Sequence, residues 1–518
     1  MLLTLSRIVC ELNRYHSPMK KILLSIVASL SVVAQAFSEI ESPLEKSVII
    51  SQQPVVPPHM LVIFGGGGDL TKRKLIPALV QLAKKGLISD HFGCIAIGRR
   101  TMSVDQFRDE VSAFISESDR PFLQQIWNKL FYISGEFESD QTYELLGFSL
   151  DQIEMELGTG GNRLFYLATP EVSFAPIVKQ LQTHRLLSQD GTLLPWSRVI
   201  VEKPFGRNLN SARLLQHELT SRLGSDQIFL IDHYLGKEVV HGLLSFRFAN
   251  PNLFVESFWN NSQIDHVSIL LSEDIGIESR GDFWEQTGML RDMVQNHAMQ
   301  LVSLIGMEKP QDFSVESIRF EKLRLLDSIR SFSPESIEKD IVRGQYGKGS
   351  VNGIEVRGYQ DENGVNPHSA IETYVAATLY IDNDRWRGVP FYIKAGKRLS
   401  KKLTEIVLSF KPNVLPVNGS DSNHLESDKL IFRIQPQAEI YWLPNVNDKD
   451  FSQQLGRRLL ESDAYERLFY EAMQGDSRNF VSIEEHLASW RIFTPVLEYW
   501  EAHLPENFPN YAAGSLGP

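Results

Sequence analysis

The segment LVIFGGGGDLTKRKLIPALVQL, residues 61–82, decides how the chain begins to fold. Leu61 to Phe64 is an apolar run that predicts a strand, Gly65 to Gly68 is an uninterrupted glycine turn, and Leu75 to Leu82 has helical periodicity. A strand, a glycine turn and a helix in this order direct backbone N–H groups and the helix dipole at a pyrophosphate, and a Cβ in the turn would hold the phosphates away. The segment favours a dinucleotide site over its alternative, a flexible surface loop.

The second predicted strand indicates which dinucleotide binds. It runs from Cys94 to Ile97 and is followed by Gly98-Arg99-Arg100-Thr101. An NAD site requires a carboxylate here for the free ribose hydroxyls, whereas arginine and threonine suit a ribose that carries a 2′-phosphate. The sequence therefore predicts NADP rather than NAD. Two exposed arginines at the start of a loop are the alternative.

Strands and helices alternate up to residue 231, which predicts a doubly wound parallel sheet of the Rossmann type. Beyond that point apolar segments follow one another mostly without helices between them, which predicts a mixed, mostly antiparallel sheet. We expect strands at 266–272, 371–381, 391–394, 404–410, 429–434 and 439–443, and helices at 237–247, 284–305, 463–473 and 483–499. The fold class is thus α/β plus α+β, with a glycine-rich tail at 511–518.

Length and composition limit the classes of protein to consider. A chain of 518 residues predicts two domains with tails, and 42% hydrophobic with 22% charged residues is typical of a globular protein. The formal net charge of -12 argues against a nucleic-acid partner, which requires a basic face. A small anionic substrate stays compatible, because a few lysines can create a local positive site. The two cysteines, Cys10 and Cys94, predict no disulfide framework.

The first forty residues do not resemble part of a fold. Met19 to Ala36 combines lysines, an apolar run and small residues, as a secretory signal does, but eighteen residues precede Met19. The apolar run is too short to span a bilayer, so we expect no membrane association of the folded part. We interpret residues 1–40 as a signal-like or unstructured leader and 41–59 as a linker. Export and a cytoplasmic location both stay open, and an NADP-linked metabolic function would favour the cytoplasm.

Two segments carry groups suited to proton transfer. IDHYLGKE, residues 231–238, leaves a predicted strand, and RDMVQNH, residues 291–297, lies inside a predicted helix. A histidine titrates near working pH, so His297 is suited to act as a general base. Asp232 could set the tautomer of this histidine across the domain interface. The alternatives are a solvated loop with a capping aspartate and a satisfied core histidine.

Two further segments carry basic groups. In EKPFG, residues 202–206, the proline fixes Lys203 at a strand exit where the nicotinamide end of the cofactor should lie. In FYIKAGKRLSKK, residues 391–402, a strand leads into five lysines and arginines. Such a segment is commonly a solvated face, but in an acidic protein it can also neutralise a phosphorylated ligand.

These motifs, in this order, resemble the glucose-6-phosphate dehydrogenase family. The resembling segments are GGGGDLTKRKL from Gly65, FYLATP from Phe165, EKPFG from Glu202, IDHYLGKE from Ile231, RDMVQNH from Arg291, KAGKRL from Lys394, DAYERL from Asp463 and WRIFTP from Trp490. They cover almost the whole chain from Met60 onward, and IDHYLGKE with RDMVQNH is the most specific pair. The resemblance implies NADP-dependent oxidation of D-glucose 6-phosphate to a lactone, the first step of the pentose phosphate pathway, without a metal.

The resemblance also implies roles for individual residues. Asp232 and His297 match the catalytic pair. The positions that match substrate contacts are Lys203, His233, Tyr234, Lys237, Glu273, Asp292, Lys397 and Lys402. Lys402 stands where part of the family has arginine, and a lysine offers a point charge instead of a planar fork. The positions that match cofactor contacts are Gly65, Gly68, Asp69, Leu70, Arg100 and Lys203.

The domain division expected from these motifs is an NADP-binding domain at 60–232 and a substrate and oligomerisation domain at 233–510. By resemblance we expect a homodimer or homotetramer. Whether a second, structural NADP binds near Arg433 stays open. Two rival functions also remain. An exported oxidoreductase similar to glucose-fructose oxidoreductase would join the same kinds of domain, but it does not account for IDHYLGKE or RDMVQNH. A non-catalytic redox sensor would not need to keep every catalytic position.

Overall fold

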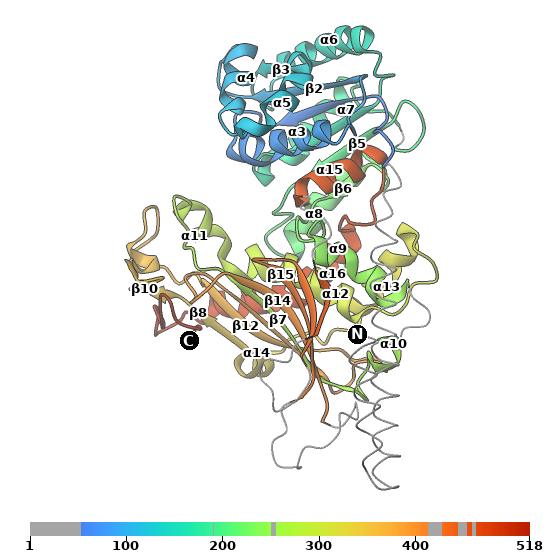
Figure 1. Ribbon diagram of the computed structural model, residues 1–518. Coiled ribbons are helices and arrows are strands. Elements are labelled where there is room, and N and C mark those ends of the chain that lie inside the picture. Colours follow the sequence, from blue (N-terminus) through green and yellow to red (C-terminus); the bar gives the residue numbers. More distant parts are fainter. Residues whose placement is uncertain (1–52, 190, 250–254, 413–426, 444–452, 458–462) are drawn as a thin grey trace.

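The computed structural model describes residues 53–518 except 190, 250–254, 413–426, 444–452 and 458–462. It contains two lobes, with the described residues from 59 to 230 in the upper one and a long curved sheet in the lower one (Figure 1). The expected leader and most of the expected linker lie outside the described residues. Within the described residues, no helix has both the length and the apolar character that crossing a bilayer requires.

The first lobe is built on a parallel sheet in the strand order β3-β2-β1-β4-β5-β6, as the alternating pattern predicted. The strands are β1 (His59–Phe64), β2 (Phe92–Gly98), β3 (Leu130–Ser134), β4 (Arg163–Leu167), β5 (Ser197–Val201) and β6 (Ile228–Leu230). Every residue of β1 and β2 is buried, because helices cover both faces of the sheet. The order of the strands reverses between β1 and β4, where a doubly wound sheet opens a crevice at its carboxyl edge.

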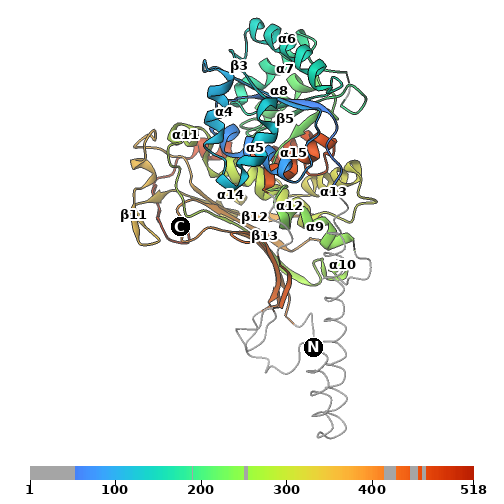
Figure 2. The same ribbon diagram turned by 45° about the horizontal axis from the view of Figure 1, so that its top comes forward.

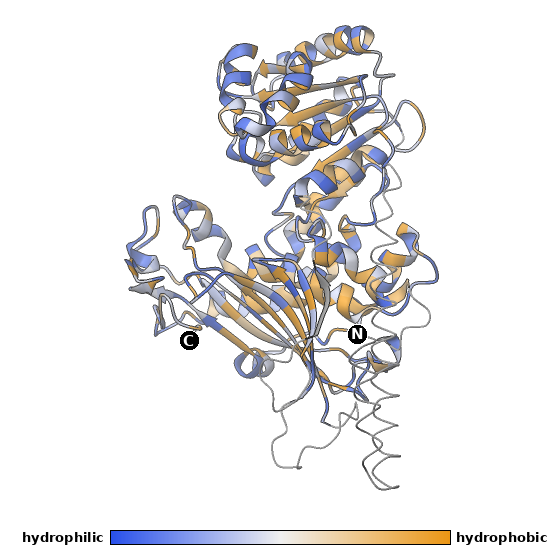
Figure 3. Cartoon of the chain, in the orientation of Figure 1, coloured by the Kyte–Doolittle hydropathy of each residue, from blue (hydrophilic) through white to orange (hydrophobic). Residues whose placement is uncertain are grey.

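The helices of this lobe connect successive strands. They are η2 (Thr71–Leu75), α3 (Ile76–Lys84), α4 (Val104–Ser112), η3 (Glu117–Asp119), α5 (Arg120–Ile126), η4 (Trp127–Lys129), α6 (Asp140–Leu157), η5 (Glu171–Ser173), α7 (Phe174–Thr183) and α8 (Leu209–Thr220). Pro77 lies in the first turn of α3, where it removes no hydrogen bond of the helix interior. Figure 3 shows apolar residues along the strands and polar residues on the outward faces of the helices.

The second lobe is built on an eight-stranded sheet in the order β17-β16-β15-β14-β7-β13-β12-β8. Its strands are β7 (Ile264–Ser272), β8 (Ile341–Gly344), β12 (Tyr374–Tyr380), β13 (Pro390–Gly396), β14 (Leu403–Phe410), β15 (Lys429–Gln435), β16 (Glu439–Leu443) and β17 (Gln453–Arg457), beside the short β9 (Tyr346–Gly347), β10 (Gly349–Val351) and β11 (Ile354–Val356). Only β7 and β13 pair in parallel, so the sheet is mixed and mostly antiparallel, as predicted.

Helices lie between this sheet and the first lobe, as Figure 2 shows from a second direction. The helices that follow β6 in the chain are α9 (Glu238–Phe248), α10 (Val255–Phe258), α11 (Gly281–Met289), η6 (Leu290–Ala298), α12 (Met299–Gly306), α13 (Val315–Asp327), α14 (Pro334–Asp340), η7 (Tyr359–Asp361), α15 (Ala464–Gln474) and α16 (Ile483–Ala502). The π-helix η6 packs against β7, β12 and β13. This contact places the polar residues of η6 between the two lobes.

The single helix predicted at 284–305 is wrong in one respect. Gly288 has a φ of 71°, which ends α11, and the chain then continues as the π-helix η6 and as α12. A Cβ on Gly288 would lie 2.5 Å from Glu372 Oε1, so only glycine fits here. Glu372 accepts the backbone N–H of Leu290 at 3.0 Å and thereby caps the new helix start. The apolar periodicity could not show this break, because the side chains on both sides of it are buried.

The carboxyl-terminal third of the chain differs from the expected domain division. Helix α15 packs on the sheet of the first lobe, where Leu468 and Phe469 join the same apolar cluster as Leu61 (Figure 1). A helix expected in the second domain is therefore part of the first lobe. The segment expected as a tail is also ordered in part, because Tyr511 and Ala512 form strand β18, which pairs with β9. Tyr511 is buried and its hydroxyl donates to the carbonyl of Lys397 at 2.8 Å.

Candidate active site

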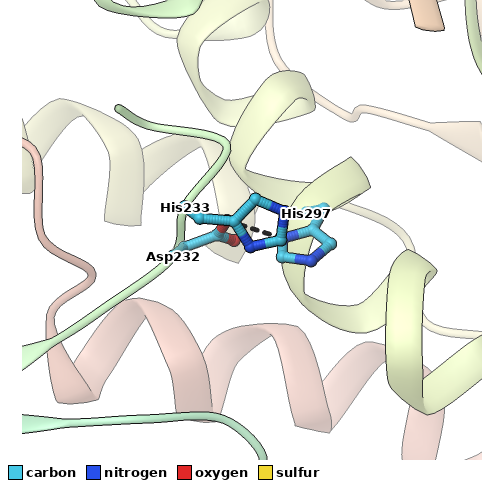
Figure 4. A group of neighbouring side chains, drawn as sticks. All are labelled: Asp232, His233 and His297. Atoms are coloured by element: carbon cyan, nitrogen blue, oxygen red, sulfur yellow. Dashed lines mark hydrogen bonds and ion pairs between the residues drawn. The ribbon is translucent and has the colours of Figure 1, made fainter. Parts of the chain in front are cut away.

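Asp232 and His297 meet between the lobes, as the sequence predicted. Asp232 directly follows Ile231 at the carboxyl end of β6, and His297 comes from η6. His297 Nδ1 lies 2.5 Å from Asp232 Oδ1, and both side chains are buried (Figure 4). The backbone N–H of Tyr234 donates to the same carboxylate oxygen at 2.9 Å. The pair is therefore held rigidly by contacts from both lobes.

Electrostatics keep this pair in one protonation state. Burial raises the pKa of the Asp232 carboxyl, but the interaction with His297 and the hydrogen bonds from His297 and the backbone of Tyr234 outweigh it, so the net pKa is lowered. Burial is the largest cause that lowers the pKa of His297, and Lys203 adds to it against the opposing effect of Asp232. Asp232 is thus ionised and His297 neutral, with its proton on Nδ1 and its lone pair on Nε2.

Lys203 covers that lone pair. Its Nζ lies 2.8 Å from His297 Nε2 and also donates to Asp292 Oδ1 at 3.1 Å and to the Asp292 carbonyl at 3.0 Å. Lys203 follows β5 and Asp292 comes from η6, so this contact joins the two lobes a second time. The charges of Lys203 and Lys397 oppose the effect of burial and lower the pKa of Asp292.

The segment after Asp232 surrounds the imidazole. The ring of Tyr234 stacks on His297 with centroids 4.3 Å apart, and the ring of His233 meets His297 edge to face at 4.6 Å. Lys237 Nζ lies 5.0 Å from the centre of the Tyr234 ring. Burial is the largest cause that lowers the pKa of His233, with further lowering by neighbouring cations, so His233 is neutral here and offers an uncharged donor. Of the expected phosphate ligands on this segment, Lys237 supplies the positive charge.

Glu273 and Lys397 are brought together by the one parallel pair of the second sheet. Glu273 follows β7 and Lys397 follows β13, and parallel strands end at the same edge. Lys397 Nζ donates to Glu273 Oε2 at 2.6 Å and lies 4.9 Å from the centre of the Trp284 ring, with only 1% of the residue exposed. Lys402 is exposed, and its charge is one of the causes that lower the pKa of Lys237. The expected substrate residues therefore border one region.

The glycine turn has the form that a pyrophosphate requires. Gly65 has a φ of 97°, and a Cβ on it would lie 2.1 Å from the carbonyl oxygen of Ala168. Thr71 Oγ1 donates to the Gly65 carbonyl at 2.9 Å, which ties the start of the helix back to the turn. Asp69 and Leu70 lie between the turn and η2, at the positive end of the helical segment. These residues fit a dinucleotide phosphate held by backbone N–H groups.

Arg100 lies at the end of β2, on the same edge of the sheet. Its side chain is exposed and forms an ion pair with Glu110, which also pairs with Lys72 at 2.8 Å. The hydrogen bond from Lys72 is the largest cause that lowers the pKa of Glu110. The two cations next to the ribose position fit the 2′-phosphate expected from the sequence.

Sequence reasoning missed two groups that support the site. Glu372 caps η6, and no motif marks it because it lies 82 residues from Leu290, the helix start that it contacts. Tyr465 of α15 stacks on His233 with ring planes 9° apart, and its hydroxyl donates to Glu202 Oε1 at 3.4 Å. Tyr465 lies in the quoted DAYERL segment, so that motif was the available signal for it.

Asp232, His233 and His297 also have ligand-type atoms within 4.8 Å of one another. Figure 4 shows the three side chains gathered at one point. The Lys203 ammonium at His297 Nε2 places a positive charge where a cation would have to bind. This charge makes the cluster unfavourable for a metal ion, whereas a neutral imidazole beside a carboxylate is suited to proton transfer.

Comparison with known proteins agrees with this arrangement over the whole fold. Residues 62–242 match the family model described as glucose-6-phosphate dehydrogenase, NAD binding domain, and residues 244–518 match the model described as glucose-6-phosphate dehydrogenase, C-terminal domain. The chain belongs to the glucose-6-phosphate dehydrogenase family. It is 45% identical over 486 residues to glucose-6-phosphate 1-dehydrogenase of Chlamydia muridarum, a match that covers 90% of this chain and 94% of the relative.

Other members of the glucose-6-phosphate dehydrogenase family give the same result. The enzyme of Bacillus subtilis is 37% identical over 473 residues, which cover 89% of this chain and 95% of the relative. Among solved structures, a glucose-6-phosphate dehydrogenase in complex with its substrate glucose-6-phosphate superposes with a TM-score of 0.78 at 32% identity, covering 90% of this chain and 96% of that chain. Glucose-6-phosphate 1-dehydrogenase from Mycobacterium avium superposes with a TM-score of 0.73, also at 32% identity, covering 89% of this chain and 95% of that chain.

Proposed function

We propose that this protein oxidises D-glucose 6-phosphate with NADP to 6-phospho-D-glucono-1,5-lactone, and that His297 is the general base. One observation carries the assignment of the base. Asp232 fixes His297 Nδ1 at 2.5 Å, which leaves the lone pair on Nε2, where Lys203 Nζ now contacts it at 2.8 Å. A histidine held in one tautomer by a buried carboxylate is suited to accept one proton and to be stabilised as the imidazolium.

The chain supplies the base and the orientation. His297 Nε2 takes the proton of the anomeric hydroxyl, and Asp232 stabilises the resulting positive charge. The carbon that becomes a carbonyl is already part of a hemiacetal, so removal of the proton avoids an unstabilised oxyanion. General base catalysis of this kind contributes a factor of ~10² to 10⁴, and positioning contributes the remainder.

Lys203 must give way for this step. Its ammonium occupies Nε2 in this structure, and the anomeric hydroxyl has to lie at the same nitrogen. Asp292 holds Lys203 through two further contacts, so a small rotation frees Nε2 and leaves the ammonium beside the sugar. Lys203 then lies between the sugar and the cofactor, where its charge opposes early protonation of His297.

The phosphate and the sugar are held by different groups. Lys237 provides the charge for the 6-phosphate, His233 and Tyr234 provide neutral donors, and the exposed Lys402 adds a second charge. Glu273, Asp292 and Lys397 bind sugar hydroxyls. Because the phosphate is remote from the bond that breaks, its binding energy can hold the reacting carbon in place.

The cofactor residues lie on the other side of Lys203. We assign Gly65, Gly68, Asp69 and Leu70 to the pyrophosphate and Arg100 to the 2′-phosphate. NADP bound by these residues would supply the acceptor for the hydride of the anomeric carbon.

A spectrophotometric assay tests the function. The purified full-length chain is mixed with NADP and either glucose 6-phosphate or glucose. NADPH formation with the phosphorylated sugar alone supports the proposal. Turnover of glucose but not of glucose 6-phosphate would overturn it and would favour an oxidoreductase of unphosphorylated sugars.

We also propose a homodimer or homotetramer and a cytoplasmic location. The eight-stranded sheet offers a broad surface for pairing between copies, and light scattering of the purified enzyme measures the assembly. A monomer at assay concentration would contradict the proposed oligomer. Mass spectrometry of the native amino terminus decides the compartment, because cleavage after Ala36 would identify an exported protein.

A further inference from the structure

A small cavity lies behind the Asp232–His297 pair. It has a volume of about 30 Å³ and is lined by residues at the ends of β5 and β6, in the helices η6 and α12, and in α16. Asp232, Gln295 and Gln300 line it, together with apolar side chains such as Val201 and Val481. Lys203, which contacts His297, lines the cavity as well, so the cavity borders the proposed site through both Lys203 and Asp232.

The cavity is lined by polar residues whose buried atoms lack partners. Asp232 Oδ1 accepts from both His297 and Tyr234, but Asp232 Oδ2 has no hydrogen-bond partner among the described residues. Within the same residues, Gln295 Nε2 and Gln300 Oε1 also have none. The exposed fractions of Asp232, Gln295 and Gln300 are 3%, 2% and 2%. A buried polar atom without a partner is costly, so a cluster of three indicates a shared ligand.

The three atoms are complementary to one water molecule. Water can donate to Asp232 Oδ2 and to Gln300 Oε1 while it accepts from Gln295 Nε2, which satisfies all three groups. A buried water typically makes about three hydrogen bonds and requires a cavity of at least roughly 10–15 Å³. The cavity is large enough for one or two waters and too small for a substrate or a cofactor fragment.

We propose that an ordered water in this cavity binds the second oxygen of Asp232, and that Gln295 and Gln300 are positioning residues that act through it. This inference deepens the proposed function, because it concerns the carboxylate that orients His297. Gln295 lies two residues before His297 in η6, and Gln300 lies in the first turn of α12. The continuous helical segment formed by η6 and α12 therefore carries the base, His297, and the two glutamines that position Asp232 through the water.

A donor on Oδ2 keeps Asp232 both ionised and oriented. Hydrogen bonds to both carboxylate oxygens prevent rotation of the Asp232 carboxylate, so His297 stays in one tautomer. The charged and titratable groups that surround Asp232 are His297 and Asp292 from η6, Glu202 and Lys203 after β5, Tyr234 and Lys237 between β6 and α9, Tyr465 from α15 and His486 from α16. Among the described residues, none of these groups donates a hydrogen bond to Asp232 Oδ2. The water supplies this missing hydrogen bond.

The variants Gln295→Met and Gln300→Met remove one polar group each and keep the length of the side chain. We expect kcat to fall about ten-fold, because Asp232 loses part of its support, with little change in the KM for glucose 6-phosphate. The acid limb of kcat/KM should move to higher pH, since a carboxylate that loses a donor is protonated more readily. Gln345→Met is the matched control. Gln345 is fully buried and donates to Ser369 and Ile371 in the second lobe, so its loss should lower the melting temperature but not kcat.

A crystal structure of the wild-type enzyme provides the independent measurement. Density for a water within hydrogen-bonding distance of Asp232 Oδ2 supports the proposal. An empty cavity in a map that shows other buried waters would overturn it, as would a direct contact between Gln295 and Asp232. Variants of Gln295 and Gln300 that behave like Gln345→Met would also overturn it. Failure of the proposed function is distinguishable, because it shows as absent turnover in the wild type and leaves the density unchanged.

Discussion

Lys203 Nζ lies 2.8 Å from His297 Nε2, the one imidazole nitrogen that Asp232 does not contact. An ammonium can donate only to an unprotonated nitrogen, so this contact requires a neutral His297 with a lone pair on Nε2. The cation also opposes protonation of the ring and is one of the causes that lower the pKa of His297. The base is thus kept unprotonated until the substrate hydroxyl replaces Lys203.

Replacement of Lys203 by methionine tests this relationship. Without the ammonium an imidazolium is less disfavoured, so the pKa of His297 rises and the base is lost at higher pH. The acid limb of the kcat/KM profile should therefore move upward in pH, in addition to a lower kcat. Lys203→Arg keeps the charge and should keep the acid limb near its wild-type position. An acid limb that stays in place in Lys203→Met would contradict electrostatic control by Lys203.

His297→Asn should reduce turnover by a factor of ~10² to 10⁴, because it removes the proton acceptor but keeps a polar side chain of similar shape. The KM for glucose 6-phosphate should change little, since the phosphate ligands are untouched. Initial rates of NADPH formation over a range of substrate concentrations separate the two parameters. An unaffected kcat would remove His297 from the mechanism.

The sequence predicts the first lobe better than the second. The strands expected at 61–64 and 94–97 lie within two residues of the bounds of β1 and β2, because buried parallel strands are continuous apolar runs between glycine and proline signals. The break at Gly288 was not predicted, since its cause is Glu372, a residue of a distant segment. The packing of α15 on the first lobe was missed for the same reason. Its amphipathic face shows that it packs, but not on which lobe.

The residues of the site were also predicted only in part from the sequence. The carboxylate of Asp232 and the ring of His297 were predicted as a pair because each belongs to a specific motif of the family. The parallel pairing of β7 with β13, which brings Glu273 to Lys397, cannot be read from either strand alone. Protonation states also depend on burial. Only the structure shows that His233 lies among several cations and is neutral.

The binding of glucose 6-phosphate should weaken at alkaline pH. Burial, together with the charge of Lys402, lowers the pKa of Lys237 to about 8. Above that pH the free enzyme loses its ammonium at the phosphate position, so KM should rise while kcat, measured with the phosphate bound, changes less. Lys237→Arg keeps its charge over this range and should flatten the profile. A wild-type KM that is constant up to pH values well above 8 would exclude Lys237 as the phosphate cation.

The ion pair between Lys322 and Glu485 connects α13 with α16 and should contribute to stability. Lys322 Nζ lies 2.6 Å from Glu485 Oε2, with 2% and 0% of the two side chains exposed. Glu485→Gln leaves a buried ammonium unpaired, which should lower the free energy of unfolding by about 3 kcal/mol. The double variant Lys322→Met with Glu485→Leu should recover most of this loss, because no charge remains buried. Urea unfolding followed by circular dichroism measures both, and equal losses in the single and double variants would contradict the argument.

Gly65→Ala tests the glycine turn. The φ of 97° disfavours any side chain, and the new Cβ would lie 2.1 Å from the Ala168 carbonyl oxygen, so the turn must move. We expect the affinity for NADP, measured by calorimetric titration, to fall more than ten-fold, because backbone N–H groups that bind the pyrophosphate are displaced. Gly242→Ala is the control. Gly242 lies in α9 and nothing approaches its Cβ position within 4 Å, so alanine there should stabilise the protein by about 0.5–1 kcal/mol and leave NADP binding unchanged. Equal NADP affinity in both variants would mean that the turn does not hold the cofactor.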